Sequence, residues 1–196
     1  MPQDQTLKND VDYTVIVPVY RSAATIEKLC TQINDVFKQM GRSYRMILVD
    51  DASNDGSWEA ICNQKELFPD ISGLRLGKNV GQHKALQCGF RYAKGQAVIT
   101  IDDDLQTPPA EIRKLVEHFE KEGPDVVYGI HSERQDSWTR RTGSKLIAKL
   151  FRKFASTPGR GSSFKLIRMN VVTEIQYLNY RYAYIDEWIS WFTNSY

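Results

Sequence analysis

Short apolar, β-branched runs alternate with amphipathic stretches along the first two thirds of this 196-residue chain. The apolar runs, each of strand length, are residues 13–20, 44–49, 72–76, 97–101 and 126–129. Helical periodicity appears between them, at residues 26–40, 58–67, 82–94 and 108–122. Strands that alternate with helices and are continuously apolar typically form a parallel sheet covered on both faces. We therefore expect an α/β fold with an open, doubly wound, mostly parallel sheet.

The length corresponds to about one domain. A composition with 41% apolar and 26% charged residues excludes wholesale disorder. Residues 1–12 are polar and unpatterned, so we expect a flexible arm there and one domain over residues 13–196. Three cysteines without metal-ligand spacing favour a reducing compartment, and no apolar run approaches the length of a membrane span. We expect a chain on the cytoplasmic side with no transmembrane segment of its own.

Positive charge is concentrated late in the chain. Between His131 and Arg181, eleven Lys and Arg residues accompany three Asp and Glu residues, giving +8, whereas the remainder carries −6. This asymmetry indicates an anionic partner at the basic flank, although a solvated surface is an alternative. Nucleic acid is not the expected partner, because the basic run lacks stacking aromatics, zinc ligands and a groove-reading motif.

Carboxylates, rather than glycine-rich phosphate loops, follow two of the expected strands. Neither G-x-G-x-x-G after the first strand nor G-x-x-x-x-G-K-[ST] anywhere is present. Instead, Asp50 and Asp51 end one strand, and Asp102, Asp103 and Asp104 end another. Open α/β sheets bind ligands at the carboxyl ends of their strands, so both groups should line one crevice.

The three consecutive aspartates suggest a divalent cation. In an extended segment, residues two apart face the same side, so Asp102 and Asp104 can share an ion while Asp103 points elsewhere. Gln106 continues this alternation. Oxygen ligands of this kind suit Mg²⁺ or Mn²⁺. An acidic turn that caps the helix beginning near Pro108 explains the same spacing equally well.

Four segments in order resemble family-two glycosyltransferases, which have the GT-A fold, a Rossmann-like nucleotide-sugar-binding domain. The form of the aspartate segment is similar to the polyprenyl-phosphate branch, which includes dolichyl-phosphate-mannose synthase. The resemblance covers the chain from about Tyr13 onward, and the segments that carry it are residues 15–20, 49–57, 79–81 and 102–109.

The resemblance implies roles for the first of these residues. Pro18, Tyr20 and Asp51 would hold the base and ribose of the nucleotide, with Asp50 nearby. A loop-shaping role for Pro18 and Tyr20 is the alternative.

It also implies a donor pocket and a metal site. Asn79, Gly81 and Lys84 match the stretch that lines the donor pocket, although Lys84 could be an exposed helix residue. Asp102, Asp104 and Gln106 would hold the cation on the diphosphate, with Asp104 acting in catalysis and Asp103 contacting the substrate.

Later segments correspond to acceptor elements of the family. Arg134 and Arg141 fall where relatives carry substrate-binding arginines. Ser163 stands where several relatives carry an acidic residue proposed as a base, which leaves Asp186 and Glu187 as candidates for that task. A solvated or capping pair at a helix start is the alternative for these two. A lipid phosphate is already ionised near neutral pH and needs no base, unlike a sugar hydroxyl.

Residues 145–154 form a basic amphipathic helical pattern, with an apolar stripe opposed by four cationic residues. Such a helix can lie on an anionic membrane surface, or it can pack its stripe against the core.

The resemblance implies a metal-dependent, inverting hexosyltransferase that moves a sugar from a UDP- or GDP-sugar to a polyprenyl phosphate at the inner face of the membrane. A saccharide hydroxyl acceptor, in polysaccharide or lipopolysaccharide synthesis, is the alternative. A nucleotidyltransferase and a non-catalytic nucleotide-sugar binder rank lower. Since relatives continue beyond a segment like residues 189–192, we also expect the domain to extend past Tyr196.

Overall fold

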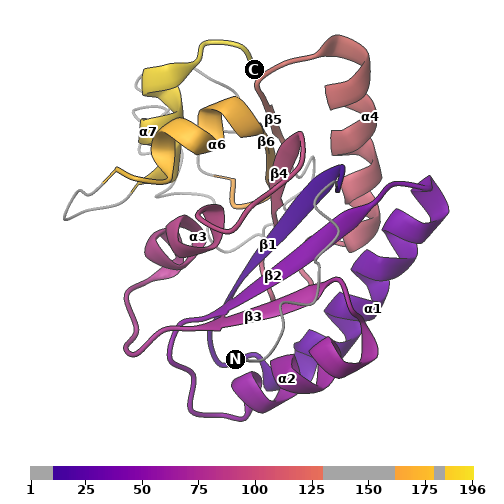
Figure 1. Ribbon diagram of the computed structural model, residues 1–196, viewed down its shortest axis with the longest axis vertical. Coiled ribbons are helices and arrows are strands. Elements are labelled where there is room, and N and C mark those ends of the chain that lie inside the picture. Colours follow the sequence, from indigo (N-terminus) through magenta and orange to yellow (C-terminus); the bar gives the residue numbers. More distant parts are fainter. Residues whose placement is uncertain (1–10, 130–161, 179–183) are drawn as a thin grey trace, which may run out of the picture.

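A computed structural model describes residues 11–129, 162–178 and 184–196. Its six strands form one sheet in the order β3-β2-β1-β4-β6-β5 (Figure 1). Strands β1 to β4 are parallel to one another, and β6 runs antiparallel to both β4 and β5. The strands are β1 (Tyr13–Val19), β2 (Tyr44–Asp50), β3 (Ile71–Arg75), β4 (Ala97–Thr100), β5 (Val126–Tyr128) and β6 (Lys165–Arg168).

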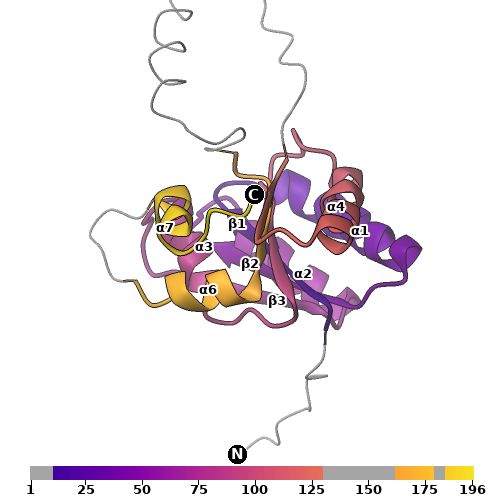
Figure 2. The same cartoon turned by 90° about the horizontal axis from the view of Figure 1, so that it is seen from above.

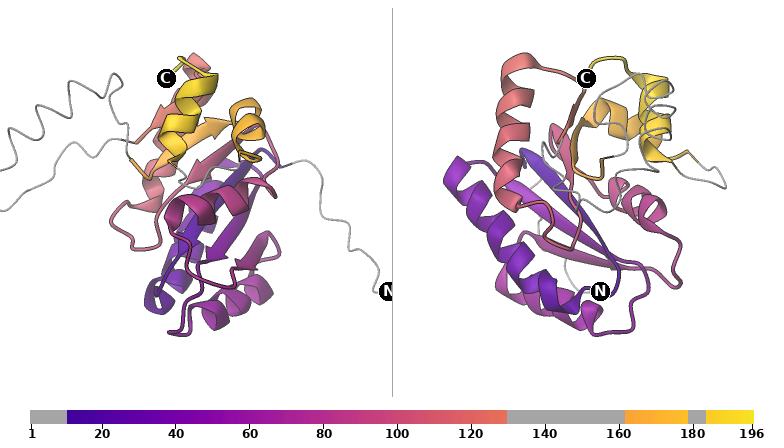
Figure 3. Two further views of the ribbon diagram at one scale, coloured as in Figure 1. Left: turned by 90° about the vertical axis from the view of Figure 1, so that its left-hand side faces the viewer. Right: turned by 180° about the vertical axis from the view of Figure 1, so that it is seen from behind.

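Helices cover both faces of this sheet. One face carries α1 (Ala23–Met40), α2 (Ser57–Leu67) and α4 (Ile112–Glu122), the last preceded by a 3₁₀ turn, Pro109–Glu111. The other face carries α3 (Gln82–Phe90), α6 (Met169–Ile175) and α7 (Ile185–Phe192). Figures 2 and 3 show the same two groups on opposite sides of the sheet. The expected α/β architecture is therefore confirmed.

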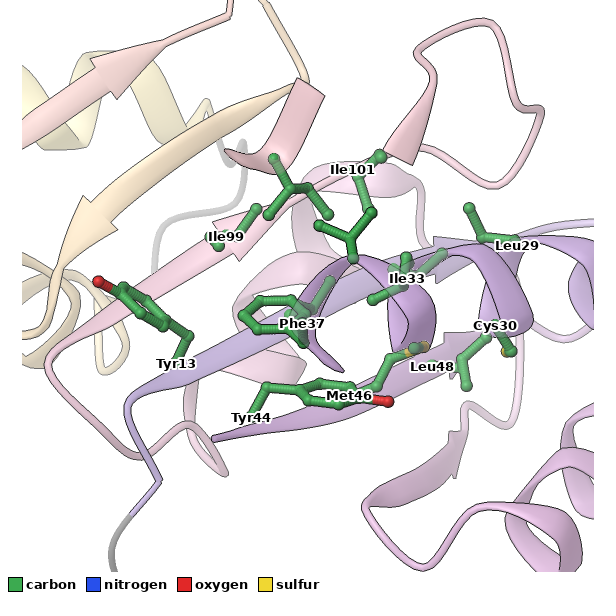
Figure 4. Packing of buried hydrophobic residues seen from close by; sticks show 14 of the residues in the cluster. Tyr13, Leu29, Cys30, Ile33, Phe37, Tyr44, Met46, Leu48, Ile99 and Ile101 are labelled. Carbon is green, nitrogen blue, oxygen red and sulfur yellow. The ribbon is translucent and has the colours of Figure 1, made fainter. Parts of the chain in front are cut away.

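Each face of the sheet has its own apolar core. Val15 and Val17 of β1 belong to the core beneath α1, whereas Ile16 between them belongs to the core beneath α3. Figure 4 shows α1 packing Phe37 against the β1–β2 face, where its ring stacks on Tyr44 at 4.5 Å between centroids. Full burial of one such side chain contributes about 1.5–3 kcal/mol to the free energy of folding. Because each core contains many of these side chains, the two cores together fix the position of the strand ends.

The structure departs from the expected elements at three places. The helix expected to reach residue 94 ends at Phe90, because a turn begins at Arg91. Strand β6 and helix α6 were not expected, since β6 is only four residues long and carries a charge at each end. Asp12, at the end of the expected arm, is hydrogen-bonded to Ser43, whereas residues 1–10 lie outside the described ranges.

Within the described ranges, no helix is both long and apolar enough to cross a membrane.

Gly89 of α3 tests the packing of this helix on the sheet. A methyl group there would lie 2.7 Å from Cγ2 of Ile16 and 3.3 Å from Cγ2 of Val49. We expect Gly89→Ala to lower the free energy of unfolding by about 1–3 kcal/mol, measured by urea denaturation. Gly77→Ala, which meets nothing within 4 Å, is the control. Equal stability of the two variants would contradict the close approach of α3.

Candidate functional site

A cavity of about 500 Å³ lies at the carboxyl ends of β1, β2 and β4. Strand β1 pairs with β2 on one side and with β4 on the other, so the strand order reverses at this point. Open α/β sheets bind their ligands at such a reversal. The lining residues are Pro18, Val19, Tyr20, Asp51, Asn79, Gly81, Gln82, Ala85, Asp102, Asp103 and Asp104.

Asp51 organises one wall of the cavity. Its carboxylate accepts hydrogen bonds from the backbone N–H groups of Val80 and Gly81, both at 2.8 Å. Gly81 adopts a φ of 87°, a left-handed conformation that favours glycine. These bonds hold the loop that carries Asn79 at the cavity.

Asp50 lies beneath the cavity rather than in its lining. Its side chain is fully buried, accepts a hydrogen bond from Ser53 N–H at 3.0 Å, and lies 3.4 Å from Nε of Arg75. The structure therefore separates two adjacent aspartates: Asp51 faces the cavity, and Asp50 supports the strand end.

All three aspartates after β4 line the cavity, but through a turn. Residues 101–107 contain no strand, and Leu105 has a φ of 59°. The extended alternation expected for this segment is therefore wrong, and Asp103 lines the same cavity as its neighbours. Asp104 accepts a hydrogen bond from the backbone N–H of Gln106 at 2.9 Å, which closes the turn. The side chain of Gln106 is exposed and is not in the lining.

Donors from three other segments hold the first two carboxylates. Gln82 Nε2 donates to Oδ1 of Asp102 at 2.6 Å, and Ser163 Oγ donates to Oδ2 of the same residue. The backbone N–H of Tyr20 donates to Asp103 at 3.0 Å. The aspartate turn is thus tied to α3, to the segment before β6 and to the end of β1.

Electrostatics disfavour this arrangement in the absence of a cation. Burial raises the pKa of Asp102, and the negative charges of Asp104 and Asp103 raise it further, against the opposing hydrogen bond from Ser163. Burial likewise raises the pKa of Asp103. Three carboxylates in one partly desolvated cavity therefore repel one another, and a bound cation would relieve that repulsion.

The donor set fits Mg²⁺ or Mn²⁺ bound together with a phosphate ligand. No group of three His, Cys, Asp or Glu residues that could hold a metal ion by itself occurs in the part of the chain that the structure describes. These cations need no such group, since they commonly use one or two carboxylates, several waters and the phosphates of a substrate. Asp102 and Asp104 supply carboxylates of this kind at one cavity.

Two other expected site residues lie outside the cavity lining. Lys84 donates to Gln87 at 3.2 Å, and its Nζ lies 5.7 Å from the ring centroid of Trp188, on the α7 side. Asp186 is buried and is ion-paired with Lys165, whereas Glu187 beside it is exposed. The predicted alternative of a solvated acidic pair therefore holds for Glu187 but not for Asp186, which is buried. Arg134, Arg141 and residues 145–154 lie outside the described residues.

Sequence reasoning missed the roles of three residues around Asp102. Gln82 follows the glycine of a family-like stretch, so its position was a usable signal. Ser163 was noted only for the missing acid, although a hydroxyl there can bind a carboxylate. Lys165 gave no signal, because its partner Asp186 is 21 residues away in the sequence.

Comparison with known proteins places these features in a family. The profile of Glycosyl transferase family 2 matches residues 14–176. Similar curated proteins are two undecaprenyl-phosphate 4-deoxy-4-formamido-L-arabinose transferases. The one from Aeromonas hydrophila is 43% identical over 141 residues, which is 71% of this chain and 43% of that protein. The one from Edwardsiella ictaluri is 36% identical over 176 residues, covering 88% and 54% respectively. The chain thus spans about half the length of these relatives.

Solved structures resemble the fold. A mannosyltransferase from Pyrobaculum calidifontis, in complex with GDP-Man and Mn²⁺, matches with a TM-score of 0.62 and 21% identity over 85% of this chain and 47% of that one. Glucosyl-3-phosphoglycerate synthase from Mycobacterium tuberculosis, in complex with Mn²⁺, UDP and glucosyl-3-phosphoglycerate, matches with a TM-score of 0.63 and 18% identity over 84% of this chain and 59% of that one. These neighbours are GT-A glycosyltransferases, so the predicted GT-A fold is confirmed.

The raised pKa of Asp102 predicts how its removal changes stability with pH. The folded protein retains this proton at pH values where the unfolded chain, with a pKa of about 4, has lost it. The contribution of Asp102 to the free energy of unfolding is therefore favourable at low pH. It is lost as the pH rises through the pKa that Asp102 has in the folded protein. We expect the metal-free Asp102→Asn variant to gain stability relative to wild type between pH 4 and pH 7, measured by urea denaturation.

Asp55→Asn is the matched control, because the pKa of Asp55 is shifted in the opposite direction. The hydrogen bond from Ser57 lowers the pKa of Asp55, so this variant should lose stability relative to wild type as the pH rises. A pH-independent difference for Asp102→Asn would contradict the crowding of the carboxylates.

Proposed function

Since this chain belongs to glycosyl transferase family 2, we propose that it transfers a sugar from a UDP- or GDP-sugar to a polyprenyl phosphate, with Mg²⁺ or Mn²⁺ as cofactor. The curated relatives are named for transfer to undecaprenyl phosphate, which supports the acceptor. Two structural neighbours contain GDP-Man or UDP together with Mn²⁺, which supports the donor class and the cation.

The observation that carries the proposal is the composition of the cavity. Its lining combines four carboxylates, those of Asp51 and of the three aspartates after β4, with Tyr20, Asn79 and Gly81. In the proposed complex, Pro18, Tyr20 and Asp51 contact the nucleoside. A cation held by Asp102 and Asp104, with Gln106 beside them, would neutralise charge on the donor diphosphate and on the departing nucleoside diphosphate.

The proposed reaction is a direct displacement with inversion at the anomeric carbon. An oxygen of the acceptor phosphate forms the new bond as the bond to the donor diphosphate breaks, and the electron pair of the broken bond leaves with the diphosphate. A phosphate oxygen is already ionised, so no side chain has to remove a proton. Two findings are consistent with this acceptor: the side chain at position 163 is a hydroxyl bound to Asp102, not a carboxylate, and Asp186 is enclosed by Lys165 and Tyr128.

The acceptor side is proposed from the sequence. Arg134 and Arg141 would bind the lipid phosphate as cations. The basic amphipathic stretch at residues 145–154 would rest on the cytoplasmic face of the membrane, where anionic lipids attract it.

Nucleotide binding tests the donor site. We expect one nucleoside diphosphate from a UDP, GDP, ADP and CDP panel to raise the melting temperature only when Mn²⁺ is present. At a ligand concentration of 100 times Kd, the stabilisation is about 2.7 kcal/mol. Asp102→Asn and Asp104→Asn should lose the Mn²⁺-dependent part, whereas Asp35→Asn, exposed on α1, should keep it. Undiminished Mn²⁺-dependent binding in both site variants would refute the proposed metal ligands.

Transfer of label tests the acceptor. With the cognate radiolabelled nucleotide-sugar, wild-type protein should place the label in a lipid extract when undecaprenyl phosphate is added. Label that appears only on saccharide hydroxyls would reject the phosphate acceptor and leave the donor assignment intact.

A further inference from the structure

A buried ion pair lies beside the cavity but does not line it. Lys165 of β6 donates through Nζ to Asp186 of α7, and their side chains are only 4% and 2% exposed. The hydroxyl of Tyr128 also donates to Asp186, at 3.2 Å. The ring of Tyr128 lies beneath the ammonium group, 5.3 Å from its centroid to Nζ. The ammonium ion is therefore held in one place by groups from α7 and β5.

The strand register brings this ion pair close to Asp102. Lys165 pairs with Thr100 in the antiparallel ladder between β6 and β4. Ser163 precedes Lys165 by two residues, and Asp102 follows Thr100 by two residues. The hydroxyl of Ser163 donates a hydrogen bond to the carboxylate of Asp102. The hydroxyl of Thr100 also donates to the backbone carbonyl of Ser163 at 2.5 Å, so the two segments stay together beyond the end of the ladder. Lys165, the first residue of β6, thus lies next to the segment whose Ser163 side chain binds Asp102, and its ammonium group is the nearby positive charge on β6.

Fold stability alone is a weak reason for a buried ion pair here. Removing two charges from water costs several kcal/mol, and well-packed apolar side chains often replace such a pair with no loss of stability. In contrast, a fixed positive charge beside three carboxylates that receive a diphosphate has a direct chemical use. Preorganised charges in a partly dry site act strongly on charge that develops there.

We propose that Lys165, held in place by Asp186, is a positioning residue of the donor site that stabilises the negative charge of Asp102 and of the diphosphate. This role rests on the proposed function. The charge matters most after the sugar has left, because the departing nucleoside diphosphate keeps the electron pair of the broken bond and is more negative than the donor. Asp186 then acts through Lys165 and not as a base.

The double variant Lys165→Met/Asp186→Leu separates this role from packing. It replaces both charges with apolar side chains, so urea denaturation should show a folded protein of similar stability. We expect its affinity for UDP or GDP with Mn²⁺, measured by calorimetry, to fall about tenfold, and kcat to fall by at least as much with a smaller change in KM for the donor. The single variant Lys165→Arg keeps the positive charge, so it should retain most of the wild-type nucleotide affinity and most of the wild-type kcat.

Arg168→Met is the matched control. Arg168 lies on the same strand and is paired with Asp125 at 3.1 Å, but it lines a different cavity. Its loss should change stability without changing nucleotide affinity or kcat. If the double variant does not fold, Lys165→Gln compared with Arg168→Gln gives the same contrast.

The outcomes are distinct. A folded double variant with wild-type affinity and kcat overturns the role of the pair and leaves the proposed function standing. Equal losses in Lys165→Arg and in the uncharged variant also overturn it, since the charge would then be irrelevant. A wild-type protein that binds no nucleoside diphosphate with Mn²⁺ overturns the proposed function itself.

Discussion

Mutual repulsion among the carboxylates after β4 is the constraint around which this domain is arranged. Three aspartates follow one buried strand, and burial raises the pKa of two of them. Asp102 and Asp103 are held by donors from separate elements, namely Gln82 at the start of α3, Ser163 before β6, and the backbone of Tyr20 after β1. Each contact offsets part of an unfavourable charge density. The two apolar cores make this possible, because they fix the strand ends from which these donors project.

The central sheet could be predicted because its signal is local. Strands β1, β2 and β4 are apolar runs whose bounds the sequence predicts to within one residue, and the glycine that ends α1 is visible in the sequence. Strand β6 could not be found in this way, since its four residues begin with Lys165 and end with Arg168. Its position is set by pairing with β4 and β5, which are distant in the sequence.

The site was predictable in kind but not in detail. The aspartates at strand ends and the family-like segments identified Asp51, Asn79 and Asp102 as neighbours across the sheet edge. A turn at the aspartates was one of the two predicted alternatives, but its shape was not predicted, because it depends on a left-handed Leu105 and on the bond between Asp104 and the backbone of Gln106. The burial of Asp186 depends on Lys165, and one sequence does not reveal which distant charges will meet.

The place of β6 between β4 and β5 has a consequence for how the protein is made. The ribosome completes β1 to β5 before it reaches Lys165, yet β5 joins the sheet only through β6. Until that strand emerges, β4 is an unpaired edge, and Asp102 lacks the hydroxyl of Ser163. Pairings between segments this far apart form slowly, because a long loop must close first. The nascent chain therefore exposes the free edge of β4 during synthesis, and the contact between Ser163 and Asp102 can form only after β6 has emerged.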